Sequence, residues 1–261
     1  MKNMRINQNF ISMLDKLNIT AILKSFSLVS FANIIKLVIS FVCIKLIAIM
    51  LGPSGVALIG QLNNFVAMIM SFSGGGIMTG ITKYVAENRD SEERSKDYIS
   101  TAFRITIYFS LTIGLLLVLL HDFISRKVLL SPDYGPVFIL FGSTLFLYAL
   151  NTMILCLLNG YQELRKYVIV NLSGSSIGLF LTLLLIFPFG LIGAMISIVT
   201  TQSITFFVSC WMIRNYPWMS WSYFSGKFNK KIGLKYMKYS LMILISTVFN
   251  SPILMIIRWS I

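Results

Sequence analysis

A lysine lies near the middle of the first long apolar stretch of this chain, within the segment SLVSFANIIKLVISFVC. At about 100° per residue of an α-helix, Lys36 shares one stripe with Ser30, Asn33, Ser40 and Cys43. A charged side chain at the centre of a bilayer costs about 3 kcal/mol, so Lys36 should face water or a partner. This stripe predicts a water-filled cavity that attracts an anionic substrate. The alternative is that Lys36 snorkels to the membrane surface or pairs with a group outside this chain.

Two further basic residues are candidates for the same cavity. Lys45 lies on the opposite side of a straight helix from Lys36, about one turn from the outer end of its apolar run, where snorkelling is easy. Arg258 follows Pro252 at the outer end of the last apolar run. For each of them the alternative is an anchor at the membrane surface.

Five side-chain amides interrupt the later apolar runs: Asn63, Asn64, Asn151, Asn171 and Gln202. Hydrogen bonding between helices is the usual reason for such residues inside a membrane. The alternative is that they line a cavity and contact sugars. Asn63, Asn64, Asn151 and Gln202 are therefore candidate polar residues of the cavity.

The residue patterns needed for covalent or metal chemistry are missing from this sequence. All nine Asp and Glu residues fall in connectors or at their edges, so no carboxylate lies in mid-span to relay protons. His121 is the only histidine, and Cys43, Cys156 and Cys210 lie within apolar runs without paired spacing. No Walker motif is present. The sequence predicts a protein that is not an enzyme and that holds no cofactor or metal.

The composition predicts that a membrane surrounds these residues. Hydrophobic residues make up 56% of the 261 positions and charged residues only 12%, about half the usual share of a soluble domain. The apolar runs reach about 20 residues, the length that crosses a hydrocarbon core of about 30 Å. The motifs LGPSG at 51–55 and FPFG at 187–190 predict tight turns between antiparallel helices.

The sequence thus predicts an all-α polytopic membrane protein with about seven transmembrane helices. These spans lie near residues 25–50, 56–82, 100–120, 137–158, 168–187, 190–213 and 236–257.

Basic residues are distributed unequally between the connectors. If connectors alternate sides, 17 of the 22 Lys and Arg residues lie on the side of the N-terminus, and only Arg126, Lys127 and Arg258 lie on the other. By the positive-inside rule this predicts a cytoplasmic N-terminus, with residues 1–23 as an interfacial segment. The net charge of +13 is mostly this topology signal, and the pattern does not predict binding to nucleic acid.

A glycine cluster interrupts the second apolar run, in the stretch FSGGGIMTGITKYVAENRD. No strand precedes Gly74, Gly75 and Gly76, so a phosphate-binding loop lacks its required context. Gly76 and Gly80 have the spacing of small residues that allows close helix approach or a local bend. We expect the helix to continue through these glycines out of the membrane. Their role is either packing or a hinge for alternating access.

Several motifs follow one another in a distinctive order. A Gly-Pro-x-Gly turn at 52–55 ends the first span, and the second span passes through the pattern G-x-x-x-G-x-T-K-Y-V-A at 76–86. The stretches LNGYQELRKYVIVNLSGSSIG at 158–178 and KYSLMILISTVFNSPILMIIR at 238–258 follow. In these motifs the chain resembles the polysaccharide-transport branch of the multidrug, oligosaccharidyl-lipid and polysaccharide (MOP) exporter superfamily. It is most similar there to bacterial flippases of O-antigen and enterobacterial common antigen.

This resemblance implies a V-shaped transporter of two six-helix lobes around a central cavity. It implies translocation of an undecaprenyl-diphosphate-linked oligosaccharide, such as an O-antigen unit for lipopolysaccharide, across the bacterial inner membrane. A diphosphate is a compact anion that suits a lysine without a counter-ion, so the resemblance implies substrate roles for Lys36, Lys45 and Arg258. Polysaccharide polymerase and chain-length proteins are implied partners. The alternatives are a multidrug exporter of the same superfamily, which should keep an acidic cation site, and a membrane fragment without transport activity.

The resemblance also divides the chain. After the interfacial segment, residues 24–213 correspond to a six-helix N-terminal lobe. Residues 214–235 correspond to a basic cytoplasmic connector, and residues 236–261 to a seventh helix that begins a C-terminal lobe. Members of the superfamily have a complete second lobe, so we expect a truncated chain that cannot flip lipid alone.

Overall fold

The computed structural model describes residues 19–74, 76–226 and 228–242, apart from the side chains of residues 19–26. Helices and the turns between them make up this part of the chain, and no strand occurs within it. The predicted all-α fold class is confirmed. Gly75, Arg258 and residues 243–257 of the predicted seventh span lie outside the described residues.

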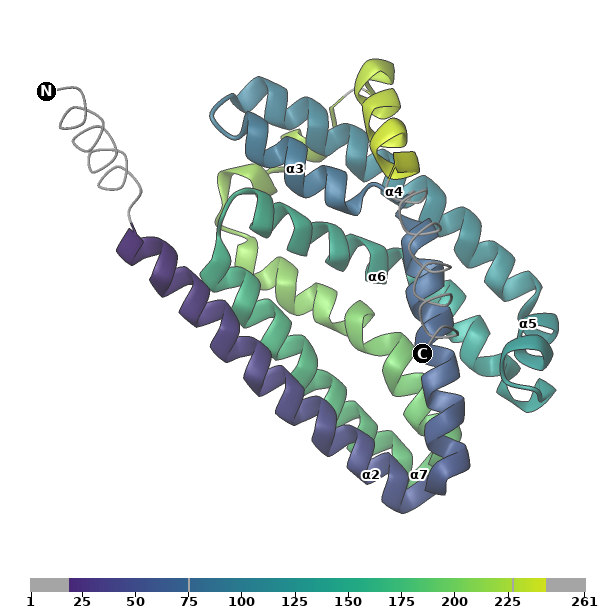
Figure 1. Ribbon diagram of the computed structural model, residues 1–261. Coiled ribbons are helices and arrows are strands. Elements are labelled where there is room, and N and C mark those ends of the chain that lie inside the picture. Colours follow the sequence, from purple (N-terminus) through teal and green to yellow (C-terminus); the bar gives the residue numbers. More distant parts are fainter. Residues whose placement is uncertain (1–18, 75, 227, 243–261) are drawn as a thin grey trace, which may run out of the picture.

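Two very long helices, each bent back on itself, form the frame of the molecule. α2 (Ile19–Ser73) bends at Gly52, where φ is 70° and ψ is −176°, and α7 (Leu164–Ile213) bends at Gly190, where φ is 54° and ψ is −128°. Glycine adopts these angles without the strain that a Cβ would cause. The nearby Pro53 and Pro188 also lack the amide hydrogen that a straight helix would use. Each helix therefore turns back and forms two arms (Figure 1), as the motifs LGPSG and FPFG predict.

The remaining helices connect these arms. α4 (Glu92–Leu119) and α6 (Gly135–Gly160) are long, and α5 (His121–Val128) and η1 (Pro132–Tyr134) join them. α3 (Met78–Asn88) precedes α4, while η2 (Pro217–Met219) and α8 (Trp221–Phe224) follow α7. The described residues 230–242 are also helical, and we call this segment helix 230–242.

Within the described residues, four helices are long and apolar enough to cross a membrane, namely α2 from Ser27, α4, α6 with η1, and α7. Because α2 and α7 each turn back, they provide two passes apiece. The first six predicted spans therefore fall on helices of the described chain, and the protein is a multi-pass membrane protein.

One sequence-based boundary is wrong. The second arm of α2 ends at Ser73 and α3 begins at Met78, whereas the sequence predicts one helix through residue 82. Gly76 lies between them with a left-handed φ of 67°, which an α-helix does not accommodate. α5 lies in the connector between the third and fourth predicted spans, and helix 230–242 begins within residues 214–235, whose assignment as a connector between lobes stays a prediction.

Most of the charged connectors gather at one end of the molecule, which we call the basic end, whereas the connector with α5 and η1 lies elsewhere. The basic end contains α3, the start of α4, the turn between α6 and α7, and the segment after α7. Its basic residues include Lys83, Arg89, Arg94, Lys96, Arg104, Arg165, Lys166 and Arg214. The bends of α2 and α7 lie at the opposite end (Figure 1).

α6 contributes to the apolar core at both ends of the molecule. Near the basic end, Leu157 belongs to the same buried cluster as Val85 of α3 and Ile99 of α4. Toward the opposite end, Phe141 belongs to a second cluster with Leu62 of α2. α6 therefore holds together the helices that position the candidate site.

α4 and α6 cross at a pair of glycines. A Cβ atom on Gly114 of α4 would lie 2.5 Å from the carbonyl oxygen of Gly142 of α6, and the reverse distance is also 2.5 Å. Any larger residue at either position would force the two helices apart. This contact sets the position of α4 against the centre of the molecule.

Candidate functional site

The polar stripe predicted around Lys36 lies on the first arm of α2. Asn33, Lys36 and Ser40 are exposed on this arm. The arm packs beside α7 (Figure 1) and buries Ile47, so the stripe lies next to this contact and not within it. In the part of the chain that the structure describes, no carboxylate forms an ion pair with Lys36. Lys36 thus carries a positive charge without an internal counter-ion on an apolar helix.

The first arm of α2 otherwise exposes large apolar side chains. Phe31, Leu37, Phe41 and Ile49 each leave between 64% and 72% of their surface uncovered. An apolar surface of this extent requires lipid or another protein segment against it. Lys36 and its polar neighbours therefore form a polar line on an apolar surface.

Apart from Asn33, the other predicted site residues on α2 lie away from Lys36. Lys45 is exposed on the same arm, on the opposite side of the helix. Asn64 is exposed on the second arm of α2. Arg258 belongs to the segment that the structure leaves undescribed, so its substrate role stays a prediction.

A cavity of about 500 Å³ lies beside the break that follows the second arm of α2. Its lining includes Asn63 and Ser71 of α2, Gly76 of the break, and Tyr148 and Thr152 of α6. These residues present amide and hydroxyl groups, which can hydrogen-bond sugars or water. Asn63 is one of the amides predicted to line a cavity. Tyr148 and Thr152 were not predicted as cavity residues, because nothing in their local sequence pattern distinguishes them.

The glycines of the break lie against helix 230–242. A Cβ atom on Gly76 would collide with the Ser240 side chain, and one on Gly80 would lie 3.1 Å from the Tyr236 ring. A Cβ on Gly74 would collide with Met78. Gly76 and Gly80 thus allow the close helix approach that their spacing predicts, while their predicted hinge role stays a hypothesis.

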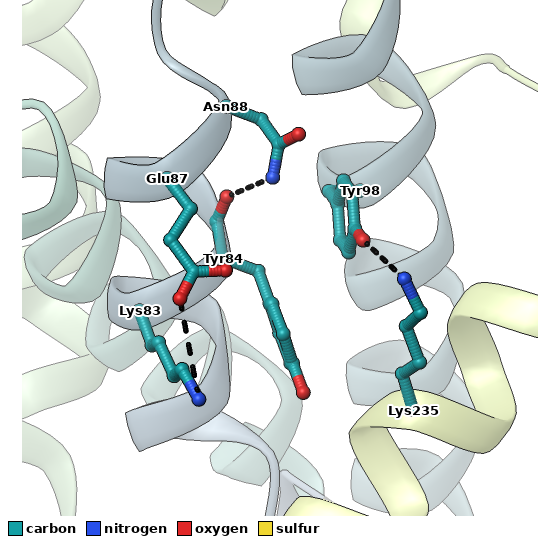
Figure 2. A network of polar contacts seen from close by, with 6 residues as sticks. All are labelled: Lys83, Tyr84, Glu87, Asn88, Tyr98 and Lys235. Atoms are coloured by element: carbon teal, nitrogen blue, oxygen red, sulfur yellow. Dashed lines mark hydrogen bonds and ion pairs between the residues drawn. The ribbon is translucent and has the colours of Figure 1, made fainter.

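A group of charged and aromatic residues, which we call the lysine–tyrosine cluster, joins three helices at the basic end. Figure 2 shows its members on α3, α4 and helix 230–242: Lys83, Tyr84, Glu87, Asn88, Tyr98 and Lys235. Lys235 Nζ donates to the Tyr98 hydroxyl at 3.3 Å, and Asn88 Nδ2 donates to the Tyr84 carbonyl oxygen at 2.8 Å. Lys83 Nζ lies 4.0 Å from Glu87 Oε1.

Aromatic rings form the centre of the lysine–tyrosine cluster. Tyr84 stacks on Tyr98 with a centroid distance of 5.4 Å, and the fully buried Tyr236 contacts both rings edge-on. Lys83 Nζ lies 4.8 Å from the centre of the Tyr239 ring. The Lys-Tyr pairs at 83–84 and 235–236 and the tyrosine of the pair at 238–239 contribute to this cluster, but Tyr98 belongs to no such pair, so the local sequence does not predict the cluster.

Asn151 and Gln202 are partners of one another. Asn151 Nδ2 donates to Gln202 Oε1 at 2.7 Å, and Ser209 Oγ donates to Asn151 Oδ1 at 2.6 Å. Asn151 is fully buried, so in this conformation it faces the second arm of α7 and not an open cavity. The two amides join α6 to α7, which is the helix-packing alternative that the sequence left open.

A second polar contact joins the residues just before and just after α7, which both lie at the basic end. The Tyr216 hydroxyl, just after α7, donates to Glu163 Oε2, just before α7, at 2.9 Å. Burial, and then the neighbouring Glu163 carboxylate, raise the pKa of Tyr216 to about 12. Tyr216 therefore remains a protonated donor at neutral pH and links the two ends of the bent helix.

Residues 22–259 match the family described as polysaccharide biosynthesis protein. The chain belongs to this family. The match covers nearly the whole sequence. It confirms the resemblance that the glycine motifs at 52–55 and 76–86 and the stretches at 158–178 and 238–258 indicate.

The chain is also similar to curated flippases. It is 24% identical over 204 residues to the Lipid III flippase of Escherichia coli (strain K12). The aligned residues make up 78% of this chain and 49% of that protein. The Lipid III flippase of Shigella flexneri gives the same identity and coverage. The chain spans about half the length of the curated relatives it matches.

Solved MOP transporters share its fold. An outward-facing multidrug resistance transporter of the MATE family superposes with a TM-score of 0.65 at 20% identity, over 87% of this chain and 54% of that one. A MOP superfamily transporter from Pyrococcus furiosus gives a TM-score of 0.64 at 17% identity, again over 87% and 54%. The described chain therefore has the fold of part of a MOP-type transporter.

Proposed function

We propose that this protein takes part in moving undecaprenyl-diphosphate-linked oligosaccharides, such as O-antigen units, across the bacterial inner membrane by alternating access. The observation that carries the proposal is the exposed Lys36 ammonium group, which has no counter-ion in the described chain and lies on an apolar arm. A diphosphate supplies the compact negative charge that such a group attracts. Family membership and the similarity to Lipid III flippases support this substrate class.

The two arms of α2 would bind different parts of the substrate. Lys36 on the first arm would hold the diphosphate, and Asn63 on the second arm would contact sugar in the 500 Å³ cavity. The arms diverge from the Gly52 bend toward the basic end (Figure 1). Lys45 and Arg258 would contribute charge farther along the path. The protein acts here as a transporter and not as an enzyme.

The unequal distribution of basic residues supports an orientation in which the N-terminus and the basic end are cytoplasmic. The arms of α2 would then open toward the cytoplasmic face, where the lipid-linked unit is received. Residues 24–213 would form the N-terminal lobe and the helix from residue 230 onward would begin the next lobe. Polymerase and chain-length proteins would act on the unit after translocation.

A multidrug exporter is the second candidate, because a MATE family transporter has the same fold. An exporter that couples to cations would need a carboxylate in its cavity. α2, α6 and α7 contain no Asp or Glu along their described lengths. The lack of a carboxylate on these three helices favours the flippase over a cation-coupled exporter.

The test replaces Lys36 in a strain whose surface polysaccharide depends on this protein. A hydrogen bond to a charged group contributes about 1.5–3 kcal/mol, so Lys36→Ala should lower polysaccharide output about 10- to 100-fold. Lys36→Glu should abolish it, and Lys36→Arg should retain part of it. Lys45→Ala tests the opposite side of the same helix. Arg126→Ala is the control, because Arg126 lies on α5, outside the proposed site, and its loss should not change polysaccharide output. Unchanged output with both Lys36→Ala and Lys36→Glu, at normal protein levels in the membrane, would exclude Lys36 from the mechanism.

A further inference from the structure

A second cavity lies along α4 near the basic end, away from Lys36 and Asn63. Its volume is about 850 Å³, within the range of about 300–1,000 Å³ that accommodates small organic ligands. α4 supplies one wall through Arg104, Tyr108 and Leu111, and the segment after α7 supplies the other through Trp221, Phe224 and Phe228. We call this cavity the α4 groove.

Among the described residues that line the α4 groove, Arg104 is the only charged one. Its Nη2 atom donates to the carbonyl oxygen of Gly226 at 2.9 Å, which holds the guanidinium group against the wall. A guanidinium group has five N–H donors, so most of them remain for a ligand. Within the described residues no carboxylate forms an ion pair with Arg104. Among the described residues, the groove thus offers one fixed positive charge at a surface that is otherwise mainly apolar and aromatic, with the hydroxyl groups of Thr112 and Ser225.

The position of Arg104 along α4 matches the level of a lipid headgroup. It is the last charged residue of α4, and the helix continues without charge to Leu119. Trp221 and Tyr108 are 74% and 75% exposed beside it, and such aromatic residues are typical of the membrane–water interface. Arg104 therefore lies where the polar part of α4 gives way to its apolar part.

Below Arg104, α4 exposes a continuous apolar stripe. Leu111, Leu115 and Leu119 are 54%, 60% and 68% exposed, and their spacing places them on one side of the helix with Tyr108. From Arg104 to Leu119 the helix rises about 22 Å. This length exceeds half of a hydrocarbon core of about 30 Å, so one acyl chain of a single leaflet can lie along the stripe.

We propose that the α4 groove binds an anionic glycerophospholipid of the surrounding bilayer. The phosphate accepts hydrogen bonds from Arg104, one acyl chain fills the groove between Tyr108 and Phe224, and the chain continues along the leucine stripe. Charge complementarity favours an anionic headgroup over a zwitterionic one, because no carboxylate of the described residues neutralises Arg104. The site is separate from the proposed transport path, since it uses α4 and the segment after α7 and not α2.

The experiment measures lipid binding to the purified full chain by native mass spectrometry. Phosphatidylglycerol and phosphatidylcholine with identical acyl chains are added in equal amounts, and the ratio of their adducts is recorded. We expect several-fold more phosphatidylglycerol adducts on the unmodified protein. Arg104→Gln should bring this ratio close to one, while Arg104→Lys, which keeps the charge, and Arg126→Gln, which lies on α5, should preserve the preference. Leu111→Trp should fill the groove and reduce both adducts without changing their ratio.

Three outcomes would overturn the proposal. The first is an unchanged lipid ratio in Arg104→Gln. The second is a complete loss of preference in Arg104→Lys, because the effect would then come from the Gly226 contact. The third is displacement of phosphatidylglycerol by undecaprenyl diphosphate that depends on Arg104, because the groove would then belong to the polyprenyl substrate. Circular dichroism and thermal melting of each variant show whether the helices are intact.

Discussion

The ammonium group of Lys83 lies 4.8 Å from the centre of the Tyr239 ring, and this contact joins α3 to helix 230–242. The fully buried Tyr236 packs on the same helix against Tyr84 and Tyr98. The break after α2 is therefore packed against the segment that follows α7. A movement of either segment must rearrange the lysine–tyrosine cluster.

The first prediction concerns the ring of Tyr236. Tyr236→Ala should lower the free energy of unfolding by about 3–5 kcal/mol, because it leaves a cavity where a large aromatic ring is fully buried. Tyr236→Phe should cost less than about 1 kcal/mol, since the hydroxyl donates to the Tyr98 carbonyl oxygen at a long 3.4 Å. Unfolding in mixed detergent micelles measures both. Equal losses in the two variants would show that the hydroxyl and not the ring stabilises the cluster.

The second prediction concerns the glycine break. Gly76→Ala should destabilise the protein by more than about 2 kcal/mol, because it combines a left-handed φ of 67° with a collision against Ser240. Gly60→Ala is the matched control: Gly60 lies within a helix and an added methyl group would meet nothing within 4 Å, so alanine should stabilise by about 1 kcal/mol. Thermal melting compares the two. Adding Ser240→Gly to Gly76→Ala should recover only the part of the loss that arises from the collision.

The third prediction separates helix packing from cavity lining at Asn151. Asn151→Ala should destabilise the protein by about 1–2 kcal/mol, because it removes the hydrogen bonds to Gln202 and Ser209. Asn171→Ala should have a smaller effect, since Asn171 donates to the Tyr167 carbonyl oxygen of its own helix. The free energy of unfolding is measured for both. Normal stability of Asn151→Ala together with lost transport would support a direct role in the cavity.

The fourth prediction concerns the bend of α2. Gly52→Ala should cost about 1–3 kcal/mol through backbone strain alone, because φ is 70°, ψ is −176° and no atom lies within 4 Å of the added methyl group. Gly60→Ala again serves as the helical comparison, and thermal melting again provides the measurement. If both variants melt at the same temperature, the Gly52 dihedral angles do not limit stability.

The arrangement of spans could be predicted from the sequence because membrane thickness imposes a length on every apolar run. Pro and Gly at 52–53 and 188–190 marked both bends for the same local reason. Asn33, Lys36 and Ser40 are exposed on one arm of α2, and the cavity that their periodicity predicts stays a prediction. These features depend only on residues close together in the chain.

The break after Ser73 and the pairing of Asn151 with Gln202 could not be predicted in this way. A run of glycines is compatible with a continuous helix, a bend or a break, and here the close approach of Ser240 accompanies the break. The partner of Asn151 lies on another helix, so its choice depends on how α6 packs against α7. The lysine–tyrosine cluster likewise requires three separate helices to meet at one place.

The turn of α2 has no loop to absorb motion, because a single glycine separates its two arms. A rotation of the backbone at residue 52 would therefore turn one helical arm relative to the other. An arm of 20 residues is about 30 Å long, so a rotation of about 10° at the pivot displaces its far end by about 5 Å. A small change in one pair of backbone angles at Gly52 would therefore alter the separation between Lys36 and Asn63.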